Sequence, residues 1–164
     1  MKRKNITTYL TQTGIIAAIY IALTFLLAPI SYGAIQMRVS EALCVLPMFT
    51  PAAVPGLFIG CLISNGLSPA ISVFDIVLGS LSTFAAAYLA YKIKIKWLVP
   101  LPAVLINAFV VPYILILSGV PDIGYWFTVL TVGIGQAIAC YGIGLPLMLI
   151  LEKYKGRIFK KNTN

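Results

Sequence analysis

The sequence predicts an all-α integral membrane protein with a single membrane domain, residues 1–164, built as a six-helix bundle. Hydrophobic residues make up 60% of the chain, charged residues make up 10%, and the mean hydropathy is +0.99. Soluble domains carry about 25% charged residues, so this composition is that of a membrane protein. Apolar runs long enough to cross a bilayer alternate with basic clusters, which explains the net charge of +8 without nucleic-acid binding.

The first helix is predicted at about 7–30, after a basic N-terminus, 1–6. This start resembles a secretory signal peptide, but the rest of the chain is equally apolar and the run is long enough to span, so we interpret it as a membrane helix. Gly14, Ala18 and Ala22 repeat at every fourth position. Small residues at this spacing let another helix approach closely, either from this protein or from a partner.

The second and third helices are predicted to be short, at 39–49 and 53–64, because Pro47, Pro51 and Pro55 interrupt the chain. Each reaches only about 17–20 Å at 1.5 Å per residue, which is less than the ~30 Å hydrocarbon core. Short helices are tolerated in a membrane where they are buried in protein or line a cavity. We therefore expect this pair to surround a cavity.

Three longer helices are predicted at 72–91, 97–118 and 123–151, followed by a basic tail, 152–164. The first of them opens with Ser72 and Asp75, a spacing typical of a helix start. Tyr125 and Trp126 open the last one, as aromatic anchors do at a membrane surface.

The basic clusters predict the topology. They lie at the N-terminus, at 92–96 and at 153–161, and an even number of helices separates each pair. Because basic loops favour the cytoplasmic side, we expect both termini to be cytoplasmic. The loop 31–37, the break near residues 64–71 and the turn 119–122 then share the outer side, so a small pocket should open there.

Arg38 and Glu41 are the first candidate site residues. Arg38 is the only arginine between residues 3 and 157, and Glu41 is one of four acidic residues. Residues three apart share a helix face. A charge near hydrocarbon is costly and usually faces a cavity, with a partner. The pair therefore predicts a ligand-facing site, although the two could also pair only with each other and fasten a loop to a helix end.

Asp75, Asn107 and Gln136 complete the candidate set, since carboxylates and amides can read the polar edge of a heterocycle. Each has a structural alternative. Asp75 could only cap its helix, and the two amides could only bond neighbouring helices. Asn65 is interpreted as a turn residue and Trp126 as an interfacial anchor.

The missing residue types argue against catalysis. The chain has no histidine, so it lacks the histidine-based catalytic sets, and it has no phosphate-binding loop motif. Cys44, Cys61 and Cys140 have neither metal-site spacing nor an even count, so they are expected to pack in the core. We therefore predict a binding protein rather than an enzyme, with no metal and no cofactor of its own.

Four stretches of the chain resemble the QueT family, the substrate-binding S components of energy-coupling-factor (ECF) transporters associated with queuosine precursors. The resemblance covers about residues 8–152. The stretches are Arg-Val-Ser-Glu-Ala-Leu (38–43), Pro-Gly-Leu-Phe-Ile-Gly-Cys (55–61), Phe-Asp-Ile-Val-Leu-Gly-Ser (74–80) and Leu-Pro-Ala-Val-Leu-Ile-Asn-Ala (101–108).

The resemblance implies a function and a set of partners. It implies a six-helix bundle of ECF S-component type in the bacterial plasma membrane that captures a 7-deazaguanine outside. A transmembrane T component and two cytoplasmic ATPase subunits, which use the ATP, would then deliver the ligand inward. The family's small-residue motif for docking the T component matches Ala18 to Ala22, with Gly14 extending it.

The resemblance also assigns roles within the pocket. A loop containing Tyr32, Gly33 and Gln36 would form a gate over it. A deazaguanine has a flat face and an edge of adjacent donors that a carboxylate reads well, and an aminomethyl form adds a cation. A second carboxylate would favour that cation. We expect Glu41 and Asp75 to be these two acids, Asn107 and Gln136 to help read the ring, and Arg38 to orient Glu41. An S component for another nutrient or vitamin, and a non-transport membrane subunit, are the competing interpretations.

Overall fold

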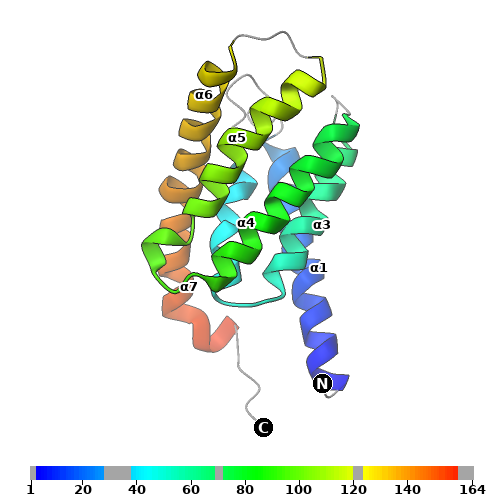
Figure 1. The fold of residues 1–164 in the computed structure, drawn as a ribbon. Helices are drawn as coiled ribbons and strands as arrows, with labels where there is room; N and C mark the ends of the chain where they lie inside the picture. The colour runs from blue at the N-terminus through cyan, green and yellow to red at the C-terminus, as the bar shows by residue number, and fades with distance from the viewer. Residues whose placement is uncertain (1–2, 28–37, 69–71, 120–123, 159–164) are drawn as a thin grey trace.

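A computed structural model describes residues 3–27, 38–68, 72–119 and 124–158, and this part of the chain consists of helices and turns without a strand (Figure 1). These residues form six helical segments. They are α1 (Arg3–Leu26); η1 (Val39–Met48); α3 (Ala53–Gly66); η2 (Asp75–Gly79) continuing into α4 (Ser80–Lys92); α5 (Leu101–Leu117); and α6 (Tyr125–Ala137), η4 (Ile138–Gly144) and α7 (Leu145–Ile158) in one run, with a short η3 turn (Lys96–Leu98) before α5.

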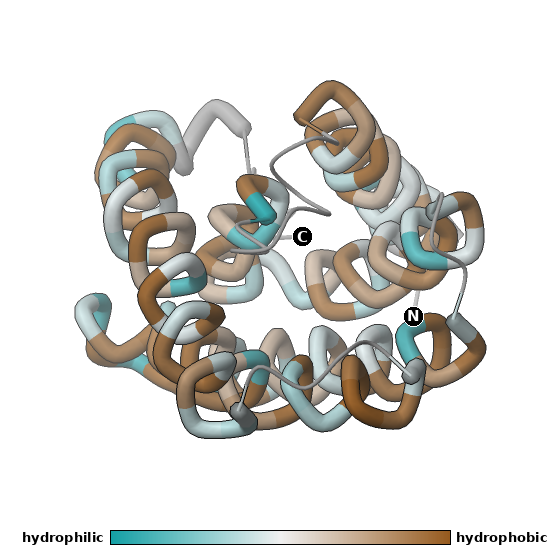
Figure 2. The backbone as a smooth tube through the Cα atoms, turned by 90° about the horizontal axis from the view of Figure 1, so that it is seen from above, coloured by the Kyte–Doolittle hydropathy of each residue, from teal (hydrophilic) through white to brown (hydrophobic). Residues whose placement is uncertain are grey.

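The helices have the lengths and surfaces of membrane segments. The stretches Ile6–Leu26, Lys96–Leu117 and Tyr125–Tyr154 are long and apolar enough to cross a bilayer, and Val39–Met48 and Ala53–Gly66 are shorter apolar helices. Large apolar side chains are exposed all over the bundle, and hydrophobic residues run along its helices in Figure 2. A soluble monomer rarely exposes so much apolar surface, so this exterior suits contact with lipid.

The centre of the bundle is η1, a 3-10 helix whose residues Ser40 to Pro47 are all buried. It packs against α1, α3, α4, η4 and α7. Its Leu43 and Leu46 enter one core cluster with α1 and α3, while Cys44 and Val45 enter a second cluster with α4, η4 and α7. η1 is thus surrounded by protein, as the sequence predicted for its short helices.

Two glycines of α3 allow the closest helix contact. A side-chain carbon added to Gly56 would come within 3.0 Å of Ile16, and one added to Gly60 would come within 2.8 Å of Tyr20. The backbone of α3 therefore lies directly against one face of α1. The predicted small-residue stripe of α1 lies elsewhere: Gly14, Ala18 and Ala22 are exposed.

One end of the bundle gathers the basic clusters. The start of α1, the turn around η3 and the end of α7 lie together at the lower end in Figure 1. The Nζ of Lys96 contacts the Oε2 of Glu152 at 2.7 Å, which joins the middle cluster to the C-terminal one. This arrangement has the even number of helices between clusters that the topology prediction requires.

Helix boundaries differ from the predictions mainly at the two ends of the chain. The first helix begins at Arg3 instead of residue 7, and the last continues to Ile158 instead of 151, so part of each basic terminal segment is helical. Lysine and arginine have high helix propensity, so a helix can continue through basic residues. The drop in hydropathy at these positions marks the end of the apolar run and not the end of the helix.

Candidate functional site

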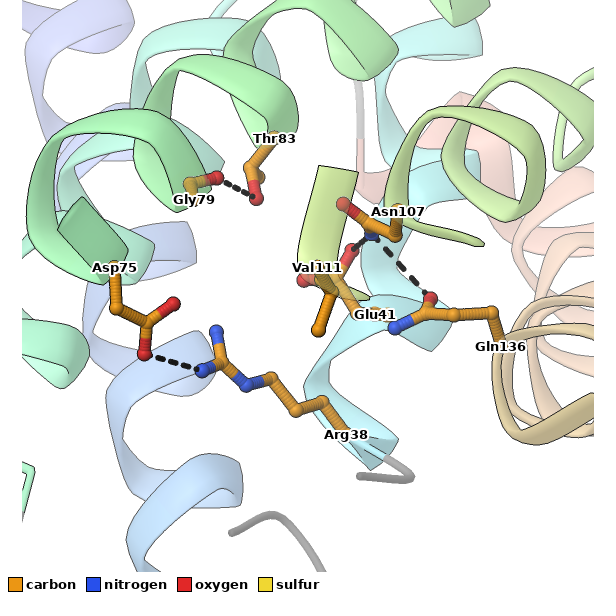
Figure 3. Close-up of a pocket in the computed structure, with 8 residues that line it drawn as sticks. All are labelled: Arg38, Glu41, Asp75, Gly79, Thr83, Asn107, Val111 and Gln136. Carbon is orange, nitrogen blue, oxygen red and sulfur yellow. Dashed lines mark hydrogen bonds and ion pairs between the residues drawn. The ribbon is translucent and has the colours of Figure 1, made fainter. Parts of the chain in front are cut away.

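The five predicted site residues line one pocket, together with Gly79, Thr83 and Val111 (Figure 3). They come from different elements that the bundle brings together. Arg38 is the N-cap residue of η1, Glu41 lies in the first turn of η1, Asp75 opens η2, Asn107 lies on α5 and Gln136 lies on α6.

Arg38 and Glu41 reach the same pocket from the start of η1. The backbone N–H of Glu41 donates to the carbonyl oxygen of Arg38 at 3.0 Å. Arg38 itself has an extended backbone at the N-cap, with φ −83° and ψ 104°, and Glu41 follows in the first turn, so both side chains start from the same end of η1. Only Glu41 of the two lies within the helix, which is a 3-10 helix and not the α-helix that the sequence predicted.

Glu41 is held by two neutral donors. The hydroxyl of Tyr20 donates to its Oε1 at 2.5 Å, and the Nδ2 of Asn107 donates to its Oε2 at 3.4 Å. The side chain is almost fully buried, with 4% exposed, so these hydrogen bonds replace water around the carboxylate. The thiol of Cys140 donates to the backbone carbonyl of Glu41 at 3.5 Å, which ties this residue to η4.

Asn107 and Gln136 form an amide pair beside Glu41. The Nδ2 of Asn107 also donates to the Oε1 of Gln136 at 3.4 Å, and both side chains are buried. In Figure 3 the amide nitrogen of Gln136 points toward Glu41 and Arg38, and the carbonyl oxygen of Asn107 points toward the side of Thr83. The pair thus presents a donor and an acceptor to the pocket.

Arg38 and Asp75 form the charged side of the pocket. The Nη2 of Arg38 lies 3.3 Å from the Oδ2 of Asp75, and its Nη1 lies 4.0 Å from the Sγ of Cys61. Asp75 therefore does more than cap a helix, and Arg38, which we expected to orient Glu41, pairs with Asp75. The guanidinium reaches away from Glu41 toward Asp75 in Figure 3.

Asn65 and Gly79 fix the position of Asp75. The Nδ2 of Asn65 donates to the backbone carbonyl of Asp75 at 2.8 Å, and Asn65 is buried, so it fastens η2 to α3 and is more than the turn residue we expected. A side-chain carbon at Gly79 would lie 2.9 Å from the Oδ1 of Asp75 and 3.0 Å from the Nδ2 of Asn65. Glycine is needed here because the two side chains pass so close to its backbone.

The pocket is nearly closed. About 290 Å³ of space lies between its lining atoms, counted with its open mouth, but only about 10 Å³ can hold the centre of a water molecule. That smaller volume is roughly one water. The lining carries one basic and two acidic side chains, a formal charge of −1 with all three ionised.

Sequence reasoning did not assign a supporting role to Tyr20. Tyr20 is 1% exposed and its hydroxyl binds Glu41. A signal was present: Thr13, Tyr20 and Thr24 recur on the face of α1 opposite the small-residue stripe, and all three are buried. Polar groups on the buried face of a membrane helix need partners, and Thr24 finds one in the hydroxyl of Ser40 at 2.8 Å.

The predicted gate, the predicted interfacial anchor and the three cysteines lie outside the pocket lining or outside the described residues. Tyr32, Gly33 and Gln36 of the proposed gate lie outside the described residues. Trp126 is 71% exposed, which suits an interfacial anchor, and the three cysteines are buried. Within the described residues no group of three or more cysteine and acidic side chains could hold a metal ion.

Comparisons with known proteins give a consistent result. Residues 10–153 match a family described as QueT transporter. A curated relative from Lactococcus lactis subsp. cremoris (strain MG1363), named Queuosine precursor transporter QueT, is 41% identical over 83 residues, which cover 49% of this chain and 48% of the relative. The match thus spans about half the length of that relative. No solved structure matches.

Proposed function

The chain belongs to the QueT transporter family, and from that premise we propose that it is the membrane subunit that captures a queuosine precursor of the 7-deazaguanine type. It acts on the outer side of a bacterial plasma membrane, as the S component of an ECF transporter. A T component and two cytoplasmic ATPase subunits supply the energy from ATP and deliver the ligand inward. The chain itself carries out no reaction on the ligand.

One observation carries this proposal: five polar and charged side chains of a largely apolar bundle converge on one pocket. Arg38, Glu41, Asp75, Asn107 and Gln136 come from four separate helical segments and meet there. Polar and charged groups inside a membrane bundle are costly and mark ligand or ion pathways. A few convergent polar groups in an apolar wall are also the usual make-up of a small-molecule site.

The donor and acceptor pattern of the pocket suits the ring edge of a deazaguanine. That edge carries a ring N–H and an exocyclic amino group side by side, next to a carbonyl oxygen. A carboxylate such as Glu41 accepts from two adjacent N–H groups, and an amide nitrogen such as that of Gln136 donates to a carbonyl. The buried position of Glu41 strengthens such contacts, because no water competes for its oxygens.

The exposed stripe of α1 supports the partner assignment. The stripe of Gly14, Ala18 and Ala22 is exposed and lies outside the face of α1 that packs on α3. It is therefore open to another helix in the membrane. Close packing through small residues is a common means of helix association in lipid. We assign this face to the T component.

Ligand binding to the detergent-purified chain tests the proposal. We would titrate 7-aminomethyl-7-deazaguanine, its 7-cyano analogue, queuine and guanine by calorimetry. The expected result is tight binding of at least one deazaguanine, lost in Glu41→Ala and retained in Glu152→Ala, a matched acidic residue at the opposite end of the bundle.

The other outcomes separate the competing functions. Binding of an unrelated vitamin but no deazaguanine would contradict the ligand and leave the S-component role. A folded protein that binds none of these heterocycles would contradict the capture role and favour a structural subunit. Equal affinity in Glu41→Ala and the native chain would overturn the assignment of Glu41 to the ring edge.

A further inference from the structure

Arg38 occupies the space that a ligand needs. The pocket has room for about one water molecule, and the guanidinium of Arg38 extends across it to Asp75 (Figure 3). A bicyclic heterocycle can enter only if a lining side chain moves. Thr83, Asn107 and Gln136 are short, buried and set within helices, whereas Arg38 is long and lies at the N-cap of η1.

Removing Arg38 from Asp75 has an electrostatic cost. The two side chains are 12% and 22% exposed, so their ion pair is largely shielded from water. Breaking a buried pair leaves an uncompensated charge, which is strongly unfavourable. The cost is avoided if a second cation takes the position of the guanidinium as it leaves.

Asp75 is built to remain in place during such an exchange. Its backbone carbonyl is held by Asn65, and its Oδ1 lies beside Gly79, where no side chain can intrude. Glu41 is less suited to receive a cationic substituent, because Tyr20 and Asn107 already donate to its two oxygens and the ring edge takes the remaining lone pairs. The formal charge of −1 on the pocket lining also favours a ligand that carries one positive charge.

We propose that Arg38 is an exchangeable internal counter-ion, and that the ammonium group of an amine-bearing heterocycle replaces it on Asp75. The inference rests on the proposed function and deepens it, because it assigns the substrate class to amines and selectivity to the Arg38–Asp75 pair. In the empty pocket the guanidinium balances Asp75. In the loaded pocket the ligand does so, and Arg38 moves to the pocket mouth. A neutral analogue must displace Arg38 without compensating Asp75.

Paired titrations of 7-aminomethyl-7-deazaguanine and its neutral 7-cyano analogue test this exchange. The native chain should prefer the amine by about tenfold or more, as expected for a charge-assisted contact. Asp75→Asn should reduce the preference to within about twofold, because the acceptor of the cation is gone. Arg38→Gln should increase the preference above the native value, since the competing guanidinium is absent. Lys96→Gln, a basic residue at the other end of the bundle, is the matched control and should leave the preference unchanged.

A double variant keeps the test decisive if Arg38→Gln does not fold. Arg38→Gln with Asp75→Asn removes both members of the ion pair, so neither is left without its partner, and it should bind both ligands with similar affinity. Equal weakening of both ligands in Arg38→Gln, or an unchanged preference in Asp75→Asn, would overturn the exchange. Binding of deazaguanines without these effects would reject this inference alone, whereas no binding by the native chain would reject the proposed function.

Discussion

At the residue scale, the carboxylate of Glu41 is positioned by a residue from a distant part of the sequence. Tyr20 lies on α1, and its hydroxyl contacts Glu41 at 2.5 Å inside a buried core. A hydrogen bond to a charged group contributes about 1.5–3 kcal/mol. Tyr20 therefore acts as a positioning residue that holds Glu41 in one orientation toward the pocket.

Replacement of this tyrosine tests the role. Tyr20→Phe removes only the hydroxyl, so the core stays filled while Glu41 loses its shortest hydrogen bond. We expect ligand affinity to fall by roughly tenfold or more, measured by calorimetry on the purified chain. In a Glu41→Gln background the same change should have little further effect, which a purely structural role of Tyr20 would not produce.

The matched control is Tyr113→Phe, because Tyr113 is 53% exposed on α5. It should bind ligand as the native chain does. A Tyr20→Phe protein with native affinity would show that Glu41 is held adequately by Asn107 and the backbone, and would refute the positioning role.

The sequence predicted the charged members of the site better than its neutral ones. Arg38, Glu41 and Asp75 stand out because charges are rare in so apolar a chain, and all three line the pocket. The ion pair between Arg38 and Asp75 was not predicted, because Asp75 is distant in sequence and spacing reveals only local neighbours such as Arg38 and Glu41. Tyr20 and Thr83 were not recognised, since a tyrosine or threonine in a membrane helix has many ordinary uses.

At the element scale, the short helix η1 determines where the pocket lies. The proline spacing predicted its shortness and burial, but local sequence did not predict its 3-10 form or its contact with η4. A side-chain carbon at Gly144 of η4 would lie 2.9 Å from the carbonyl oxygen of Ala42, so the two backbones touch. Such contacts depend on residues about a hundred positions apart, which no periodic pattern in either segment encodes.

The close contact of α3 with α1 gives a second prediction. Gly60→Ala would place a carbon 2.8 Å from the Cβ of Tyr20 and 3.2 Å from the carbonyl oxygen of Ala17, so the helices must separate. Overpacking of this kind costs about 1–3 kcal/mol. We expect a lower midpoint of thermal unfolding in detergent, together with weaker ligand binding because Tyr20 shifts.

Gly66→Ala is the control within the same helix, since nothing lies within 4 Å of the added carbon. It should unfold at or slightly above the native midpoint, because alanine favours helix. If the Gly60 and Gly66 variants unfold at the same temperature, the α1–α3 contact is looser than the structure indicates.

At the scale of the whole molecule, the number of helices between the basic clusters determines how the bundle lies in the membrane. The bundle places α1's start, the η3 turn and the end of α7 together, as the even helix count predicted. The side of the membrane that this end faces is a prediction from the excess of basic residues. Single cysteines introduced at exposed positions at the two ends can test it.

Leu67 and Lys94 are suitable positions because both are exposed and lie at opposite ends of α3 and α4. We expect Leu67→Cys to react with a membrane-impermeant maleimide in intact cells, and Lys94→Cys to react only after the cells are permeabilised. The native cysteines are buried and should contribute little background. The reverse labelling pattern would place the pocket on the cytoplasmic side and contradict capture from outside.

The two faces of α1 lead to the last prediction. One face holds Tyr20 against the ligand site, and the other presents Gly14, Ala18 and Ala22 to the membrane. If the outer face docks the T component, a bulky residue there must block close helix approach without reaching the pocket. Ala18→Trp should therefore abolish co-purification with the T component and uptake of ligand, while the isolated chain binds ligand with native affinity.

The control is Leu130→Trp, at an exposed apolar position on α6, which should preserve both co-purification and uptake. Retained co-purification in Ala18→Trp would assign docking to another face, whereas loss of ligand binding by the isolated chain would show that the two faces of α1 are not independent.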